Sequence, residues 1–147
     1  MSLAPRPSPR WFALPLLALG VAGFAAAWLL VALGGAGMVA WLAPLAGLDM
    51  VLLLGLARWP AGASRAGWAV LATAATIALA NFCIVAAQLG QTLGLGPVES
   101  ALRMGPAYAW LLAGMANRPA DLALYAAGLL AAGWAGFSAR RPAPSAR

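Results

Sequence analysis

Residues 38–57 limit the fold of this chain more than any other stretch, because they form a run of 20 residues in which Asp49 is the only charged side chain. A helix of about 20 predominantly apolar residues is long enough to cross the hydrocarbon core of a bilayer. A carboxylate near the centre of such a helix costs roughly 2.5–3.5 kcal/mol on insertion scales. The stretch therefore predicts a transmembrane helix that carries one costly side chain, Asp49.

The composition of the whole chain agrees with a membrane protein. Of its 147 residues, 64% are hydrophobic and only 8% are charged, whereas soluble domains carry about 25% charged residues. The net charge of +6 comes from nine arginines, spread singly or in pairs, against three acids. Scattered positive charges in a membrane protein report topology, so we expect the lipid bilayer, and no nucleic acid, as a partner.

Three further apolar runs predict an all-α, polytopic membrane protein with four transmembrane helices, at residues 11–33, 38–57, 67–90 and 120–138. The first run is 23 residues long, and because a signal peptide has an apolar core of only about 7–15 residues, we expect an uncleaved helix. The short break at residues 34–37 makes the first two helices an antiparallel hairpin. We expect residues 11–138 to form a single domain between a disordered tail, 1–10, and a second tail, 139–147.

The arginines orient this predicted four-helix domain. Seven of them fall on one side of the membrane, and two, Arg103 and Arg118, fall on the other with Glu99 and Asp121. Cytoplasmic loops carry the excess of positive charge, so we expect a bacterial inner-membrane protein with both termini cytoplasmic. The tryptophans agree, because they gather near the predicted interfaces: Trp11, Trp59, Trp68 and Trp134 on the inner side, and Trp28, Trp41 and Trp110 on the outer side.

Small residues recur at helical spacing in two of the predicted spans. The fourth span has Gly128, Ala132 and Gly136 at successive i,i+4 positions, a pattern that lets helix backbones approach closely in lipid. The second span has a similar face, within an arc of about 80°, made of Pro44, Gly47, Val51 and Gly55. Both faces predict helix–helix packing rather than a particular function.

The third span is the most polar of the four. It and the residue just beyond it place four polar side chains within an arc of roughly 80°: Thr73, Asn81, Gln88 and Gln91. In lipid such a face turns toward other helices or a wet cavity. The helical rise puts Asn81 and Asp49 at similar depth, so a hydrogen bond between these two side chains is geometrically reasonable.

Asp49 has two interpretations from sequence. It is either a carboxylate that responds to protons or cations, or a protonated, hydrogen-bonded acid that fixes the register of its helix. It points about 180° away from the small-residue face of its own helix. If that face packs inside the bundle, the side chain of Asp49 is expected to face another subunit.

The segment between the third and fourth spans forms a separate unit. Pro97, Glu99 and Arg103 predict a short helix with an i,i+4 ion pair, which Gly105 and Pro106 interrupt. Residues 107–116 are apolar but too short to span, so they are either interfacial or re-entrant. We interpret this segment as a lid over an outward-facing cavity, a docking surface, or a loop on the membrane, with these candidate contacts: Glu99, Arg103, Tyr108 and Trp110.

The residue inventory argues against an enzyme. The chain has no histidine, which excludes imidazole metal sites, bis-histidine haem ligation and histidine acid–base catalysis within it. The single cysteine, Cys83, permits no internal disulfide and is expected to be a small buried residue. No GxSxG, P-loop or GxGxxG motif is present, so we expect no catalytic residues, no metal and no cofactor.

The second and third spans carry a family resemblance. The residues concerned are Leu45-Ala46-Gly47-Leu48-Asp49, then Leu52-Leu53-Leu54-Gly55-Leu56, then a loop with Arg58 and Arg65. An acid in the second helix, an apolar run, a glycine and a basic turn resemble the DoxX-like family of small four-helix membrane proteins. The resemblance covers about 45 residues and implies a four-helix inner-membrane protein, sometimes an accessory subunit of membrane redox complexes.

The sequence thus favours a non-enzymatic accessory or structural subunit of a membrane complex, with other membrane subunits or a second copy of the chain as partners. The alternative is a small transporter or channel subunit. It would use Asp49 together with Asn81 and Gln88 along a polar path.

Overall fold

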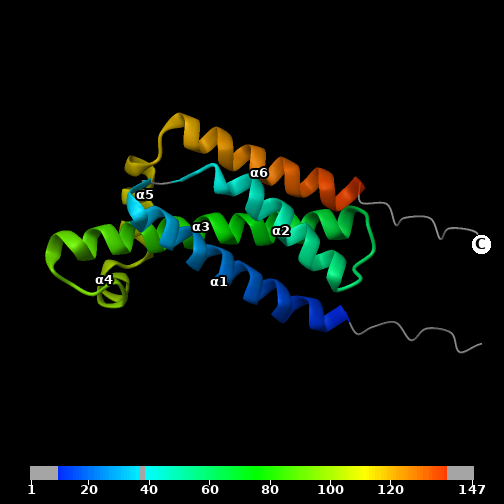
Figure 1. Ribbon diagram of the computed structural model, residues 1–147, viewed down its shortest axis with the longest axis horizontal. Helices are drawn as coiled ribbons and strands as arrows, with labels where there is room; N and C mark the ends of the chain where they lie inside the picture. The colour runs from blue at the N-terminus through cyan, green and yellow to red at the C-terminus, as the bar shows by residue number, and fades with distance from the viewer. Residues whose placement is uncertain (1–9, 37–38, 139–147) are drawn as a thin grey trace, which may run out of the picture.

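The computed structural model describes residues 10–36 and 39–138, and within these ranges the chain folds into helices joined by turns, with no strand. The two predicted tails lie outside the described residues, apart from Arg10. The main helices are α1 (Ala13–Val31), α2 (Leu42–Leu56), α3 (Ala63–Leu93), α4 (Pro97–Met104), α5 (Pro106–Ala116) and α6 (Pro119–Ser138), shown in Figure 1. A 3-10 turn, Arg10–Phe12, precedes α1, and an irregular helical turn, Ala32–Ala36, follows it.

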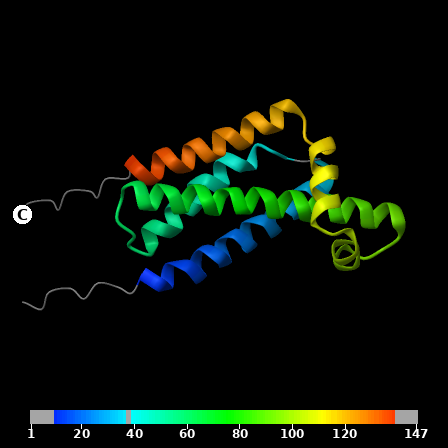
Figure 2. The same ribbon diagram turned by 180° about the vertical axis from the view of Figure 1, so that it is seen from behind.

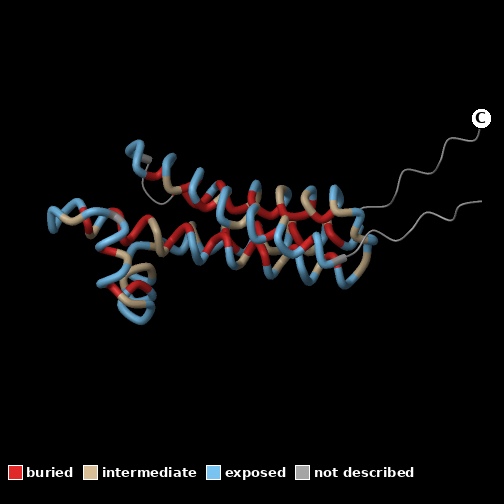
Figure 3. Tube along the Cα trace, turned by 90° about the horizontal axis from the view of Figure 1, so that it is seen from below, coloured by how far each residue is buried: buried red, intermediate tan, exposed pale blue. Residues whose placement is uncertain are grey.

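Four of these helices, α1, α2, α3 and α6, form an antiparallel bundle (Figures 1 and 2). The start of α1, the turn between α2 and α3 and the end of α6 lie together at one end, which we call the termini end. The helices α4 and α5 lie at the opposite end, the α5 end, where α5 runs across α3 (Figure 2). Buried positions lie where the bundled helices face one another (Figure 3).

Three helices are long and apolar enough to cross a membrane: Ala13–Gly35, Ala63–Leu93 and Pro119–Ser138. The helix α2 is apolar but has only 15 residues, fewer than the predicted span at 38–57. Proline explains the difference, because a proline ring clashes with the carbonyl four residues earlier in a helix. Pro44 therefore fits the first turn of a helix that begins at Leu42, and it excludes a regular helix through Ala40.

The helix α3 is the central element of the bundle. It contacts α1, α2 and α6, and 56% of its most apolar window is buried, compared with 22% for α1 and for α6. With 31 residues it is roughly 46 Å long, and it extends past both ends of the predicted span at 67–90. It ends at Gly94, whose φ of 67° is the left-handed conformation that glycine adopts at helix C-termini.

Small residues bring the backbone of α6 against its neighbours, as the sequence predicts. A Cβ atom added to Gly128 would lie 2.7 Å from the carbonyl carbon of Ala43 in α2, and one added to Gly136 would lie 2.8 Å from the Cα of Ala66 in α3. A Cβ on Gly47 would lie 2.6 Å from the carbonyl oxygen of Gly128. The predicted faces of the second and fourth spans therefore pack against each other, with no room for a larger side chain.

The segment between α3 and α6 also follows the sequence pattern. The predicted short helix is α4, and the predicted break falls at Gly105, with φ of 69°, directly before Pro106. The predicted apolar run at 107–116 is α5, which is 11 residues long. One detail differs: Cys83, expected to be buried, is partly exposed on α3.

Candidate functional site

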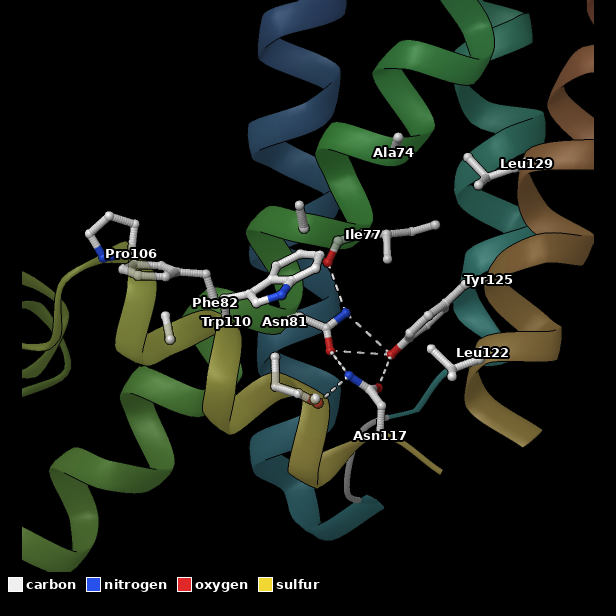
Figure 4. A pocket seen from close by; sticks show the side chains of 14 residues that line it. Ala74, Ile77, Asn81, Phe82, Pro106, Trp110, Asn117, Leu122, Tyr125 and Leu129 are labelled. Carbon is white, nitrogen blue, oxygen red and sulfur yellow. Dashed lines mark hydrogen bonds between the residues drawn. The ribbon is translucent and has the colours of Figure 1, made fainter. Parts of the chain in front are cut away.

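Three polar side chains from different segments meet at the α5 end of the bundle (Figure 4). Asn81 belongs to α3, Asn117 follows the last turn of α5, and Tyr125 belongs to α6. The phenol oxygen of Tyr125 lies 2.7 Å from Oδ1 of Asn117 and 3.2 Å from Nδ2 of Asn81. Nδ2 of Asn117 lies 3.1 Å from Oδ1 of Asn81, so the three side chains form a closed hydrogen-bonded cluster, which we call the amide–phenol cluster.

Local structure holds each member of this cluster in place. Asn117 ends α5, and both its backbone N–H, at 3.0 Å, and its Nδ2, at 2.7 Å, donate to the carbonyl oxygen of Ala113. The next helix is capped by Asp121, whose carboxylate accepts from the backbone N–H of Arg118 at 2.8 Å. The phenol ring of Tyr125 packs on the buried indole of Trp28 in α1, with ring centroids 6.3 Å apart.

The cluster lines a cavity of about 570 Å³ between α3, α5 and α6. Its other walls are almost entirely apolar. They consist of Ala74, Ile77, Ala78, Phe82, Pro106, Ala109, Trp110, Ala113, Gly114, Leu122 and Leu129. The hollow is open along part of its wall, so it is a cleft between the three helices and not an enclosed void inside the bundle.

Asn81 and Tyr125 are 7% and 8% exposed, so the polar atoms of the cluster are largely removed from solvent. Buried amides and hydroxyls are costly unless they form hydrogen bonds, and here each member bonds to the other two. The cavity wall is therefore apolar except for one small polar area, whose side chains are hydrogen-bonded to one another.

Asp49 lies apart from this site. Among the described residues its side chain forms no hydrogen bond or ion pair, and the partners of Asn81 are Ile77, Tyr125 and Asn117. The Asp49–Asn81 hydrogen bond that the sequence suggested is thus not formed. The reason is the small-residue packing: Gly47 lies against α6, which turns the opposite face of α2, with Asp49, away from that contact.

The other polar residues of the predicted face on α3 are not brought together. Thr73 is buried, and its hydroxyl donates to the carbonyl of Ala69 within its own helix. Gln88 and Gln91 are exposed, and Gln88 lines a separate, smaller hollow of about 350 Å³. Only Asn81 of this face belongs to the cavity.

The predicted contacts of the outer segment also divide. Glu99 and Arg103 form the expected i,i+4 ion pair, with 2.6 Å between Oε1 and Nη2, on the exposed surface of α4. Tyr108 is exposed on α5. Trp110 is 81% exposed and lines the cavity at its rim, so it is the one member of this group that joins Asn81.

Asn117 and Tyr125 are the site residues that sequence reasoning missed. Asn117 stands in Asn117-Arg118-Pro119, a pattern that on sequence alone indicates only the end of a helix. A signal for Tyr125 was available, because it carries the only side-chain hydroxyl of the fourth span before Ser138 at its very end. A buried Asn81 needs such a partner.

A buried charged side chain, Arg65, lies at the termini end. It stands in the first turn of α3 and is 8% exposed, and its Nη2 donates to the carbonyl oxygen of Val51 at 2.8 Å. A Cβ on Gly55 would lie 3.0 Å from this nitrogen, so the absence of a side chain at Gly55 leaves space for the guanidinium group of Arg65. Within the described ranges its Nε has no hydrogen-bond partner, and no carboxylate pairs with it.

The part of the chain that the structure describes holds no group of three or more metal-ligating side chains of the His, Cys, Asp or Glu type. Comparison of the chain with protein-family models, with curated proteins and with solved structures finds no match.

Proposed function

We propose that this chain is a non-enzymatic membrane protein that binds a lipid-soluble small molecule in the cavity between α3, α5 and α6. The observation that carries the proposal is the cavity itself, with its amide–phenol cluster. Binding sites for small molecules are typically concave, mostly apolar and roughly 300–1,000 Å³ in volume, with few convergent polar groups. The cavity of about 570 Å³, lined by Asn81, Asn117 and Tyr125 among apolar residues, has these properties.

The chemistry of the cluster supports binding rather than catalysis. Two carboxamides and a phenol are neutral near pH 7, and they offer hydrogen bonds rather than a nucleophile with an adjacent base. A protein of this kind would act as an accessory component that retains a molecule for a partner subunit or for a second copy of the chain. That role agrees with the resemblance of its second and third spans to the DoxX-like family.

The membrane arrangement is part of the same proposal. We propose that α2 spans the bilayer with α1, α3 and α6, and that the termini end faces the cytoplasm of a bacterial inner membrane. The distribution of arginines supports this orientation, because Arg58 and Arg65 belong to the termini end and Glu99 and Asp121 to the α5 end. A reporter that is active only in the cytoplasm should be active when fused after Arg147. Activity there of a reporter that works only in the periplasm would contradict the orientation.

The alternative role, a transporter or channel subunit, has less support from the geometry. It requires a polar path through Asp49, Asn81 and Gln88, and these three side chains face separate surroundings. If the alternative holds, Asp49→Asn should abolish proton-coupled uptake or conductance in liposomes.

The binding function is tested by filling the cavity. Gly114 lines the cavity, and a Cβ placed on it meets nothing within 4 Å, so Gly114→Leu should occupy the space without disturbing the bundle. In lipid nanodiscs, we expect saturable binding of 4-octylphenol to the unaltered protein. In Gly114→Leu we expect the dissociation constant to be at least tenfold larger.

The matched control is Gly23→Leu, because Gly23 of α1 also has open space at its Cβ and lies outside the cavity. It should bind 4-octylphenol as the unaltered protein does. Equal binding by all three proteins, or no saturable binding by any, would contradict the proposed function.

A further inference from the structure

We infer that this cavity selects a ligand that carries a hydrogen-bond donor, such as a hydroxyl or N–H group, over a ligand that carries only an acceptor. The inference rests on the proposed function and names the chemical class of its ligand. It follows from counting which donors and acceptors of the amide–phenol cluster are already used inside the protein.

The orientation of both carboxamides is fixed by backbone carbonyls. Nδ2 of Asn81 lies 2.9 Å from the carbonyl oxygen of Ile77, and Nδ2 of Asn117 lies 2.7 Å from that of Ala113. A carbonyl oxygen can only accept, so the side-chain atom that faces it must be the nitrogen. Neither amide can be turned over without placing two acceptors against each other.

With the amides fixed, every N–H and O–H of the cluster has an acceptor. The second N–H of Asn81 donates to the phenol oxygen of Tyr125 at 3.2 Å, and the second N–H of Asn117 donates to Oδ1 of Asn81 at 3.1 Å. The phenol has a single proton, and its shorter contact is 2.7 Å to Oδ1 of Asn117, against 3.3 Å to Oδ1 of Asn81. The cluster thus has no donor left for a ligand.

Acceptor capacity remains. Each amide oxygen has two lone pairs and accepts one of these bonds within the circuit, and the phenol oxygen likewise accepts only from Asn81. A hydroxyl or N–H group on a ligand can use these lone pairs. A ketone, ester or ether brings only another acceptor to the same atoms, where it loses its hydrogen bonds and gains none.

Among the described residues that line the cavity, Trp110 is the one other side chain that carries a donor, its indole N–H. It lies at the rim, where it is 81% exposed. A ligand that has an acceptor in addition to its donor can therefore place the acceptor at the rim and the donor against the cluster. Replacing Trp110 with phenylalanine removes this second group and isolates the preference of the cluster.

The test uses two isomers of the same composition: 4-octylphenol, which has a hydroxyl donor, and 4-heptylanisole, which has a methyl ether and no donor, and an alkyl chain shorter by one methylene. In nanodiscs that contain the Trp110→Phe protein, we expect 4-octylphenol to bind about three- to tenfold more tightly, as the net worth of one hydrogen bond predicts. The Gly114→Leu variant in the same nanodiscs corrects for partition of each probe into lipid.

Tyr125→Phe distinguishes this hydrogen-bond circuit from a merely structural role of the tyrosine. Removal of the phenol oxygen frees one N–H of Asn81 as a donor toward the cavity, so the preference for 4-octylphenol should fall to less than twofold and 4-heptylanisole should bind more tightly than before. A preference unchanged in Tyr125→Phe would overturn the inference.

The remaining outcomes separate this inference from the proposed function. If both isomers bind equally to the Trp110→Phe protein and Gly114→Leu blocks both, the donor preference is wrong and the binding function stands. If neither isomer shows binding that Gly114→Leu blocks, the proposed function fails, and this inference fails with it.

Discussion

The two ends of the bundle are built in opposite ways along the same helix, α6. Toward the termini end, α6 presents Gly128, Ala132 and Gly136, and its backbone touches α2 and α3. Toward the α5 end it presents Leu122 and Tyr125, which line a cavity of about 570 Å³ between α3, α5 and α6. Small residues on α6 therefore coincide with close backbone contact, and larger ones with the cavity.

The buried polar groups of the two ends differ in the same sense. Arg65 at the termini end is an unpaired cation that reaches a single backbone carbonyl of α2, while its Nε has no partner among the described residues. Asn81, Asn117 and Tyr125 at the α5 end satisfy one another. The amide–phenol cluster is therefore held by mutual side-chain hydrogen bonds, whereas Arg65 is held by a single bond to the backbone of α2 beside the close contact of Gly136 with Ala66.

The largest expected effect breaks the close backbone contact between the middle of α6 and the first turn of α2. Gly128→Leu would place a branched side chain where even a Cβ lies 2.7 Å from the backbone of Ala43. Overpacking costs about 1–3 kcal/mol and occasionally more, and backbone atoms cannot move aside as a flexible side chain can. We therefore expect a loss of about 3 kcal/mol in the free energy of unfolding, measured by titration with sodium dodecyl sulfate.

The control for this prediction is Gly23→Leu, since Gly23 is exposed on α1 and a Cβ there meets nothing within 4 Å. It should unfold at the same detergent fraction as the unaltered protein or a slightly higher one, because leucine is the better helix former. Equal destabilisation by both substitutions would contradict the assignment of Gly128 to a close backbone contact.

The second effect breaks the amide–phenol cluster. Asn81→Leu removes the partner of both Tyr125 and Asn117 and leaves their polar atoms unsatisfied at the cavity wall. Leaving buried groups unsatisfied costs about 1–3 kcal/mol, so a destabilisation in this range is expected in the same detergent titration. Gln88→Leu, on the exposed side of α3, is the control and should change stability by less than about 0.5 kcal/mol. Equal effects of the two substitutions would show that the cluster does not stabilise the α5 end.

The helices were predictable because local residues decide where they begin and end. Gly105 and Pro106 mark the break between α4 and α5, and Pro119 starts α6. The helix α2 is shorter than the predicted span at 38–57, because Pro44 fits the first turn of a helix that begins at Leu42. The membrane class itself follows from the length and hydropathy of α1, α3 and α6.

The site was only half predictable, because it depends on tertiary contacts. Asn81 stood out as an amide in an apolar run, but its partners Asn117 and Tyr125 lie 36 and 44 residues away along the chain. Depth along the membrane suggested Asp49 as the partner, since both residues lie near the middle of their spans. The depth of a residue in the membrane does not specify which way its side chain points. The contact of Gly47 with α6 places Asp49 on the opposite face of α2.

The third effect sharpens the contrast between the two buried polar groups. Arg65→Met keeps an apolar stem of similar length, and it removes both the hydrogen bond to Val51 and the unsatisfied Nε. Replacing a buried charge with an apolar side chain of similar volume is often close to neutral. We therefore expect a change of less than about 1 kcal/mol in the free energy of unfolding, smaller than that of Asn81→Leu. A loss above about 2 kcal/mol would show that the termini end, too, depends on a polar contact.

The smallest effect concerns the ion pair on α4, which lies at the α5 end but on its exposed surface. Glu99→Gln removes the charge partner of Arg103, and both side chains are exposed to a large extent. Exposed i,i+4 pairs on helices contribute about 0.3–0.5 kcal/mol, and salt screens them. The detergent titration should therefore detect a loss of at most about 0.5 kcal/mol, and 4-octylphenol should bind to Glu99→Gln as to the unaltered protein. A binding defect in this variant would show that the binding site extends beyond the cavity to α4. The polar groups that distinguish the α5 end from the termini end would then include more than the three residues of the amide–phenol cluster.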